Sequence, residues 1–369
     1  MIRANQPHIE NLIGRPIHEL DSPALLLDLA ASDRNIAQLA QFFGDKHAQL
    51  RPHFKNHKCS TLARRQLDAG SAVGITCAKL GEAEILADNG FDDILIANQI
   101  VGDIKLRRLS DVAKKTNVTV AIDHLEQART LSKMVSATNI TVGVLVEVDI
   151  GMNRCGIEPG NAALELTQKI QPLPGIYFNG LQAYEGHLVN LEDATERQVQ
   201  SHQDMQLAID TRRMIEAAGI PVNTLSGCST ATYDMTGIMA GVDEVQAGTY
   251  ATMDCTYHKL RPELEMALTI ICTVISCHGD NAVLDVGVKG ASGEFGSPII
   301  ADHPDAQIPN FCSEEHCVVQ HIGGLHVGDK VQMIPSHACT TCNLYRQLHV
   351  HQDQHIVDIW PIEASGLLA

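Results

Sequence analysis

The sequence predicts an α/β fold in which a (β/α)8 barrel is followed by a mostly β C-terminal domain. Over about 230 residues, short apolar strands alternate with amphipathic helical segments, as in parallel βα units. About eight or nine such units fit a barrel. After about residue 255 helical periodicity fades and strand-like segments dominate. The predicted domains are therefore residues 22–254 and residues 255–369, with part of residues 1–21 joining the second.

A doubly wound open sheet is the alternative fold, and it is disfavoured because no GxGxxG motif follows the first strand. Each predicted barrel strand is a short apolar run followed by a segment with helical spacing. The predicted strands are residues 24–29, 49–54, 74–78, 93–98, 119–123, 142–149, 180–184, 223–228 and 244–250. The predicted helices are residues 31–46, 60–70, 79–90, 102–116, 124–137, 161–170, 191–219 and 229–240. Ser32 or Asp33 is the expected N-cap of the first helix.

Composition excludes several classes of function. Hydrophobic residues make up 44% of the chain and charged residues 19%, which is typical of a globular protein. The net charge of −17 disfavours nucleic-acid binding, which needs a concentrated basic surface. No apolar run reaches the ~18 residues of a membrane span, and the N-terminal residues lack the apolar core of a signal peptide. A cytoplasmic protein is therefore expected, and its 11 scattered cysteines argue against a disulfide framework.

The stretch Leu50–Cys59 (LRPHFKNHKC) begins as a strand and then turns polar and basic. Lys55 lies at the end of this predicted strand, with His53 and His57 nearby. A lysine becomes a nucleophile when its surroundings lower its pKa, and it then forms Schiff bases with carbonyl groups, including that of pyridoxal phosphate. The alternative is an ordinary basic strand end at the surface. These residues alone leave both interpretations open.

Other candidate residues also follow predicted strands. Functional residues of a (β/α)8 barrel lie where strands end and the next loop begins. Lys55, Tyr184, Ser226 and Tyr250 all fall at such positions. The fold prediction therefore brings these four residues towards one end of the barrel.

The segment RPHFKNHK, residues 51–58, resembles the RPHxKxHK motif of the D-threonine aldolase and eukaryotic-type D-serine dehydratase family. Members of that family are pyridoxal-phosphate enzymes with an alanine-racemase-like fold, and the resemblance extends from Asp21 to the C-terminal DIWPIEASG. It implies that Lys55 carries the cofactor. Lys58 is the neighbouring, weaker candidate.

Two loops are candidates for holding the cofactor phosphate. The segment 224–230 (TLSGCST) leaves a strand and is predicted to open a helix, where backbone N–H groups and the helix dipole favour an anion. An ordinary N-cap turn is the alternative. The segment 246–250 (QAGTY) ends the next strand. The resemblance assigns phosphate binding to residues of both loops, namely Gly227, Thr230, Gly248, Thr249 and Tyr250.

Two further strand ends carry candidate residues. The segment 149–156 (DIGMNRCG) resembles the DxGxxRxG string of alanine-racemase-like enzymes, which implies that Arg154 contacts the cofactor's phenolate oxygen. Tyr184 is expected to contact the ring or the substrate. His187 is the candidate general base or the residue that orients a metal-bound water. The corresponding histidine of the aldolases lies a few residues later, where this chain has Asn190.

His337 and Cys339 are the candidate metal ligands. On a strand, two residues that alternate across a third face the same side, and imidazole and thiolate both bind zinc. Cys342 is a possible third ligand or the redox partner of Cys339. A four-ligand structural zinc site would need a further pair of ligands, and the nearest candidates, Cys312 and Cys317, are loosely spaced. In the family, this HxC pair holds a divalent metal beside the substrate's β-hydroxyl. Cysteine favours zinc, with manganese or magnesium as alternatives.

The resemblance implies a metal-assisted, pyridoxal-phosphate-dependent aldolase. It would cleave a small β-hydroxy-D-amino acid of the D-threonine or 3-hydroxy-D-aspartate type to glycine and an aldehyde. A D-serine or 3-hydroxyaspartate dehydratase, which gives a keto acid and ammonia, is the first alternative. A non-catalytic pyridoxal-phosphate carrier and an amino-acid racemase are less favoured, because the first lacks a second domain and the second needs a tyrosine base with no match here. Relatives of this fold are commonly homodimers.

Overall fold

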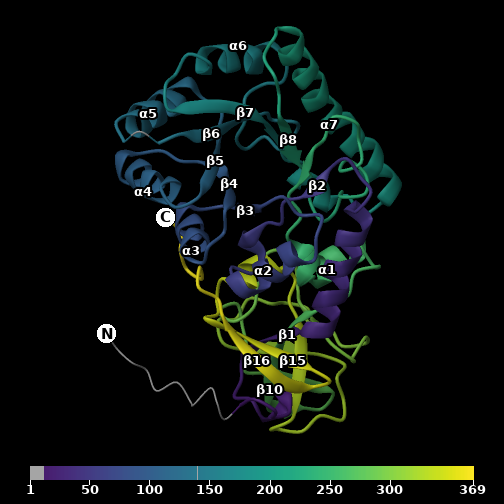
Figure 1. Cartoon of the computed structure of the whole chain (residues 1–369). Helices are drawn as coiled ribbons and strands as arrows, with labels where there is room; N and C mark the ends of the chain where they lie inside the picture. Colours follow the sequence, from purple (N-terminus) through teal and green to yellow (C-terminus); the bar gives the residue numbers. More distant parts are fainter. Residues whose placement is uncertain (1–11, 139) are drawn as a thin grey trace. The chain divides into compact units, whose positions relative to one another are not determined.

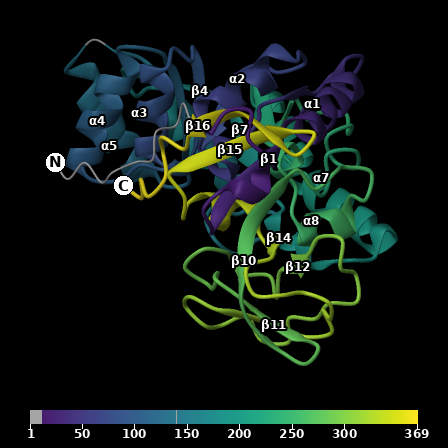
Figure 2. The ribbon, with the colours of Figure 1, turned by 90° about the horizontal axis from the view of Figure 1, so that it is seen from below.

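The computed structural model describes residues 12–138 and 140–369, which form two compact units (Figures 1 and 2). Each unit is assembled from segments that are separate in the chain. The unit called here the barrel unit consists of residues 37–55, 62–248 and 367–369. The unit called here the β unit consists of residues up to Ile36, residues 56–61 and residues 249–366.

Eight parallel strands form the barrel, in the order β2-β9-β8-β7-β6-β5-β4-β3. They are β2 (Gln49–Leu50), β3 (Ile75–Cys77), β4 (Asp93–Gln99), β5 (Asn117–Ile122), β6 (Val142–Glu147), β7 (Ile176–Ala183), β8 (Thr224–Gly227) and β9 (Glu244–Val245). Parallel bridges from Leu50 to Ala72 and from His53 to Thr76 join the β2 segment to the β3 segment. These bridges link the two ends of the sheet, so the predicted (β/α)8 barrel is confirmed.

Helices follow the barrel strands as the sequence predicts, and α3–α7 lie outside the ring of strands (Figure 1). The helices are α1 (Leu29–Phe43), α2 (Ser60–Asp68), α3 (Leu80–Asp88), α4 (Asp103–Ala113), α5 (Leu125–Ser136), α6 (Asn161–Ile170) and α7 (Ala194–Ala217). The longest, α7, starts at a conventional N-cap, because the Asp193 side chain accepts a 2.8 Å hydrogen bond from the N–H of Glu196. Strand β6 is buried at every position, as expected for a strand covered on both faces.

A buried ion pair lies within the barrel wall. Arg51, directly after β2, donates from Nε and from one terminal nitrogen to both carboxylate oxygens of Glu244 on β9, at 2.9 and 2.8 Å. The same terminal nitrogen lies 3.1 Å from Asp93 on β4. The Arg51 side chain is only 9% exposed, so these carboxylates compensate its charge inside the protein.

A second sheet dominates the β unit. Its main path is β12-β14-β10-β1-β15-β16, and β11 and β13 extend from β10. Figure 2 shows β1 between β10 and β15. The strands are β1 (Ala24–Asp28), β10 (Leu268–His278), β11 (Asn281–Leu284), β12 (Ile299–Ile300), β13 (Cys317–Val319), β14 (Lys330–Ile334), β15 (Gln347–Gln352) and β16 (His355–Pro361). The prediction of a mostly β second domain is confirmed.

The first predicted strand lies in a different sheet from the one expected. Strand β1 pairs antiparallel with β10 and parallel with β15, so it belongs to the β unit and not to the barrel. The division of the chain therefore differs from the predicted boundaries of 22–254 and 255–369. The apolar run of β1 is buried on both faces, and such a run carries no indication of which sheet it will join.

Part of the N-terminal region belongs to the β unit. Ile17 and Leu20 pack against Ile271 and Ile356 in one hydrophobic cluster. The prediction for residues 1–11 lies outside the described residues. No helix in the described parts of the chain combines the length and apolar character needed to span a membrane.

Two local predictions are wrong. Helix α1 begins at Leu29, and Asp28, not Ser32 or Asp33, accepts a hydrogen bond from a first-turn N–H, that of Ala31. Residues 229–240 form a series of turns instead of the predicted helix. Ser and Thr side chains in this segment bond to nearby backbone and hydroxyl groups, which competes with helix formation.

Candidate active site

A cavity of about 200 Å³ opens in the barrel unit where the strands end. Its walls come from residues at or after the ends of β2, β3, β4, β6, β7 and β9, which is where (β/α)8 enzymes place their functional groups. The lining residues are His53, Lys55, Ala78, Ala97, Asn98, Arg154, Cys155, Gln182, Tyr184 and Gln246. Three of the predicted cofactor residues, Lys55, Arg154 and Tyr184, are therefore brought together.

Lys55 is the lysine of this cavity. It lies in the short 3-10 helix η3 (Phe54–Asn56), and its backbone N–H donates to Nδ1 of His53 at 3.4 Å. Its Nζ atom lies 5.4 Å from the centre of the Tyr184 ring. The alternative, Lys58, is buried in the β unit and donates from Nζ to the carbonyl oxygen of Ala364. The geometry thus separates the two lysines that the motif left as candidates.

The loop after β6 presents Arg154 to the same ring. Asp149 Oδ1 accepts hydrogen bonds from the N–H groups of Gly151 and Asn153, at 3.0 and 3.1 Å, which folds the loop back on itself. Gly151 has a φ of 121°, a conformation that favours glycine. The Arg154 Cζ atom lies 5.4 Å from the centre of the Tyr184 ring, the same distance as Lys55 Nζ.

The charges around the cavity suit an anionic aromatic ligand. Among the described residues, neither Lys55 nor Arg154 has a carboxylate within ion-pair distance. Glu147 at the end of β6 is buried, and burial raises its pKa, against the lowering effects of Gln99 and Arg154. Lys55 and Arg154, which have no salt-bridge partner among the described residues, both lie beside the Tyr184 ring. This arrangement fits a bound pyridoxal ring that carries a phenolate oxygen.

Amide side chains form a polar wall that the sequence did not identify. Gln246, just after β9, donates from Nε2 to Ser226 Oγ at 3.0 Å and to Gln182 Oε1 at 3.4 Å. Asn98 donates from Nδ2 to the carbonyl oxygen of Ala78 at 2.9 Å. Gln182 precedes Tyr184 by two positions in the predicted strand 180–184, a spacing that could have indicated that both residues share a face.

The predicted phosphate residues are not among those lining this cavity. Gly227 and Gly248 lie in the barrel unit, as does the buried Thr230, whereas Thr249 and Tyr250 lie in the 3-10 helix η5 (Thr249–Ala251) of the β unit. A Cβ atom at Gly227 would clash with the carbonyl oxygen of Ala183, so close strand packing already requires glycine there. Because residues 229–240 form turns, the expected helix dipole at this loop is absent.

His187, the predicted general base, also does not line the cavity. Its Nε2 atom lies 2.9 Å from Asp204 Oδ2 on α7, and its Nδ1 atom is buried without a hydrogen-bond partner in the described structure. A Cβ atom at Gly151 would lie 3.2 Å from the His187 ring, so the imidazole packs against the loop that carries Arg154. A catalytic role for His187 stays a prediction.

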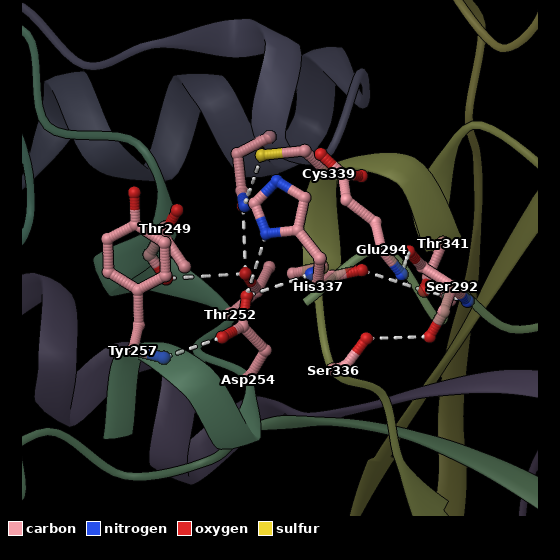
Figure 3. A network of polar contacts seen from close by, with 12 residues as sticks. Thr249, Thr252, Asp254, Tyr257, Ser292, Glu294, Ser336, His337, Cys339 and Thr341 are labelled. Carbon is pink, nitrogen blue, oxygen red and sulfur yellow. Dashed lines mark hydrogen bonds and ion pairs between the residues drawn. The ribbon is translucent and has the colours of Figure 1, made fainter. Parts of the chain in front are cut away.

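The predicted metal ligands lie close together in the β unit, but their local structure differs from the expected strand. Strand β14 ends at Ile334, and His337 is the extended N-cap residue of the short helix α9 (Ala338–Cys342). The alternation argument was therefore wrong, because the helix begins between the two residues. Figure 3 shows the His337 ring between Asp254 and Cys339. Phe295 contacts this ring edge-to-face, at 4.7 Å between centres.

The chemistry of this pair suits a cation. Burial lowers the pKa of His337, but the Cys339 sulfur and the Asp254 carboxylate outweigh burial and raise it to about 11. The nitrogen and sulfur donors thus lie in a negative environment that a divalent metal would neutralise. In the described structure, no three His, Cys, Asp or Glu side chains are arranged to hold a metal. Cys342 is buried, Cys312 is exposed, and both are free thiols, so a four-ligand zinc site is not found there.

Comparison with known proteins relates nearly the whole chain to one group of proteins. The family model of the alanine racemase N-terminal domain matches residues 27–255, and that of a putative serine dehydratase domain matches residues 267–351. The chain is 34% identical to D-threonine aldolase from Arthrobacter sp., covering 96% of this chain and 95% of that protein. It is 30% identical to 3-hydroxy-D-aspartate aldolase from Paracoccus denitrificans (strain Pd 1222), with 97% and 95% covered.

A solved structure agrees with these relatives. The crystal structure of D-threonine aldolase from Filomicrobium marinum matches with a TM-score of 0.92 and 33% sequence identity, covering 97% of this chain and 99% of that one. Two full-length relatives at 30% identity or more and a family match over more than half of the chain agree with the motifs around Lys55 and Arg154. The chain therefore belongs to the alanine-racemase-like family that includes D-threonine aldolase and 3-hydroxy-D-aspartate aldolase.

Proposed function

We propose that this protein is a metal-assisted, pyridoxal-phosphate-dependent aldolase that cleaves β-hydroxy-D-amino acids to glycine and an aldehyde. The observation that carries the proposal is the placement of Lys55, Arg154 and Tyr184 around one cavity at the strand ends. The relatives at 30% identity or more over nearly their whole length are aldolases of this type, which supports the same reaction here.

The proposed cofactor residues have separate roles. Lys55 would hold pyridoxal phosphate covalently through Nζ, Arg154 would face its phenolate oxygen, and Tyr184 would contact its ring. The residues proposed for the phosphate are Gly227, Thr230, Gly248, Thr249 and Tyr250. When bound, the cofactor supplies an electron sink for the charge that develops at the substrate's α-carbon.

His337 and Cys339 are the proposed ligands of a divalent metal, with zinc favoured over manganese and magnesium. The metal would polarise the substrate's β-hydroxyl as a Lewis acid. His187 is proposed as the base that removes a substrate proton. The supporting observation for the metal is the buried nitrogen and sulfur pair beside Asp254 (Figure 3).

The test compares Lys55→Ala with Lys58→Ala, using D-threonine and D-3-hydroxyaspartate as substrates. We expect Lys55→Ala to lose both the visible absorption of the bound cofactor and the release of glycine. Lys58→Ala should keep the cofactor absorption if it folds, which circular dichroism would check. Retention of cofactor binding and glycine release by Lys55→Ala would refute the assignment.

A dehydratase is the second candidate, because a putative serine dehydratase domain matches residues 267–351. Product identification separates the two reactions. With D-3-hydroxyaspartate, glycine and glyoxylate indicate the aldolase, whereas oxaloacetate and ammonia indicate the dehydratase. A protein that binds the cofactor but no divalent metal, and turns over none of these substrates, would favour a non-catalytic carrier.

We also propose a cytoplasmic homodimer that acts on small molecules. The net charge of −17 supports a protein that does not bind nucleic acid. Family resemblance alone supports the dimer. Sedimentation of the cofactor-loaded protein would measure the oligomeric state, and a single monomeric species at all concentrations would contradict the dimer.

A further inference from the structure

Asp254 is a buried carboxylate at the centre of the network in Figure 3. Its Oδ1 atom accepts a 2.8 Å hydrogen bond from the N–H of Tyr257, in the first turn of α8 (Cys255–Leu260). Its Oδ2 atom accepts a 2.9 Å hydrogen bond from the N–H of Ala338, the first residue of α9. Two backbone donors on separate helices thus fix the orientation of this carboxylate.

The same Oδ2 atom faces His337. It lies 3.4 Å from Nδ1, a distance typical of an ion pair rather than a short hydrogen bond. Nδ1 is buried and has no hydrogen-bond partner of normal geometry within the described residues. Asp254 is completely buried, and in the part of the chain that the structure describes His337 is the one Lys, Arg or His side chain within 4 Å of its carboxylate. The imidazole Nδ1 is therefore the side-chain group that can donate a hydrogen bond to this buried carboxylate.

Such an arrangement has a known chemical use. A histidine that binds a metal through one ring nitrogen commonly donates the other N–H to a carboxylate, which fixes the tautomer and the ring orientation. A proton on Nδ1 would point at Asp254 and leave Nε2 as the lone-pair donor. In Figure 3 the Nδ1 side of the ring faces Asp254, and the opposite nitrogen lies towards the Cys339 sulfur.

Cys339 has a comparable neighbour. The buried side chain of Asn56 donates from Nδ2 to Cys339 Sγ at 3.5 Å. Its Oδ1 atom accepts a 2.8 Å hydrogen bond from Thr252 Oγ1, which assigns the amide its orientation and leaves the NH2 group for the sulfur. This contact holds Cys339 Sγ at one position beside the His337 ring.

We propose that Asp254 and Asn56 are positioning residues of the metal site. Asp254 holds the His337 ring through Nδ1, so that Nε2 is the nitrogen that binds the metal, and Asn56 orients the Cys339 sulfur. The inference rests on the proposed metal site. Beyond that site, the inference specifies Nε2 as the His337 nitrogen that binds the metal. It also assigns Asp254 as the supporting partner of His337 and Asn56 as that of Cys339.

The test measures metal affinity directly, on full-length protein loaded with pyridoxal phosphate and stripped of metal. Zinc binding is followed by competition with a chromophoric chelator. We expect Asp254→Asn and Asn56→Leu each to raise the zinc Kd about 10- to 100-fold. Ser336→Ala is the matched control, because this buried hydroxyl next to His337 bonds to the Ser292 carbonyl oxygen, away from the ligands. It should keep the Kd within about twofold.

Cobalt(II) gives a second readout that a purely structural role would not change. A thiolate ligand produces a charge-transfer band with cobalt, and this band reports the hydrogen bond on the sulfur. We expect Asn56→Leu to shift the band, whereas Asp254→Asn should weaken cobalt binding and leave the band of the saturated protein in place. If both variants are folded and bind zinc as tightly as the unaltered protein, the proposal is wrong.

The controls separate this inference from the proposed function. His337→Ala and Cys339→Ala should abolish tight zinc binding. If the unaltered protein binds no divalent metal, the metal site itself is refuted, and the inference falls with it. If the unaltered protein binds zinc and only the ligand variants lose it, the metal site stands and the roles of Asp254 and Asn56 are refuted.

Discussion

Glu185 Oε1 accepts a 2.6 Å hydrogen bond from Thr236 Oγ1, while its Oε2 atom is buried without a hydrogen-bond partner in the described structure. Burial raises the pKa of Glu185 to about 7, against the lowering effect of the Thr232 and Thr236 hydroxyls. Thr236 also contacts Cys228, so this carboxyl group adjoins the loop proposed to hold the cofactor phosphate.

The raised pKa predicts a pH dependence of stability. Below pH 4.5, the ordinary value, Glu185 is protonated in both states and its contribution is fully present. Between pH 4.5 and about 7 the unfolded chain ionises first, so the free energy of unfolding falls as pH rises. We expect Glu185→Gln to remove this loss, which amounts to about 3 kcal/mol at most. Urea denaturation at about pH 5 and pH 8 measures it.

The surface carboxylate Glu165, paired with Lys169 on α6, provides the control. Glu165→Gln should leave the pH dependence as it is in the unaltered protein. The idea fails if Glu185→Gln and Glu165→Gln give the same dependence between these pH values.

Arg154→Met is expected to weaken cofactor binding by about 10- to 150-fold. The substitution removes the cation that faces the Tyr184 ring and the proposed phenolate, and a charge-assisted hydrogen bond contributes about 1.5–3 kcal/mol. Equilibrium dialysis of pyridoxal phosphate measures the change. Arg129→Met, on the outer helix α5, is the control with an unchanged Kd. If both variants bind pyridoxal phosphate with the same affinity, Arg154 does not contact the cofactor.

Substitution of His187 tests the predicted base. If His187 removes a substrate proton, His187→Gln should lower kcat by about 10²- to 10⁴-fold, with cofactor binding retained. Asp204→Asn should lower kcat less, because Asp204 acts through its 2.9 Å contact with the imidazole. A kcat unchanged in His187→Gln, together with a lower Tm, would make His187 a support for the Gly151 loop.

The buried pair of Arg51 and Glu244 predicts a large effect on stability. Glu244→Ala leaves the guanidinium with Asp93 as its only carboxylate among the described residues, and breaking a buried ion pair typically costs about 3–5 kcal/mol. The midpoint of chemical denaturation should fall accordingly. Glu216→Ala, which removes a partly exposed pairing to Arg212, should change stability by less than about 1 kcal/mol.

Much of the barrel could be predicted because its signals are local. Runs such as Val142–Glu147, followed by segments with helical spacing, identify βα units without tertiary information. The motif residues Lys55 and Arg154 were predicted, and both line the cavity. The error at β1 has a physical cause, since a short apolar run pairs with any sheet that buries it.

Other features depend on distant contacts that periodicity does not encode. Asn56 meets Cys339 across 283 positions in the chain, and Asp254 meets Ala338 across 84. The turns at residues 229–240 depend partly on the bond from Thr236 to Glu185, 51 positions away. A single sequence contains no indication of these pairings, so the supporting residues of the site became visible only in three dimensions.

The interleaved course of the chain limits how this protein can be divided or recombined. Strand β1 precedes the first barrel segment and residues 56–61 lie between two barrel segments, yet both belong to the β unit. A truncation after residue 254 would deprive β1 of both neighbouring strands, β10 and β15. To transfer the β unit from one homologue to another, the two sequences would therefore have to be joined at several positions. One of these positions lies between Lys55 and Asn56. Single-crossover chimeras should misfold, whereas chimeras built on the compact units should retain both folds.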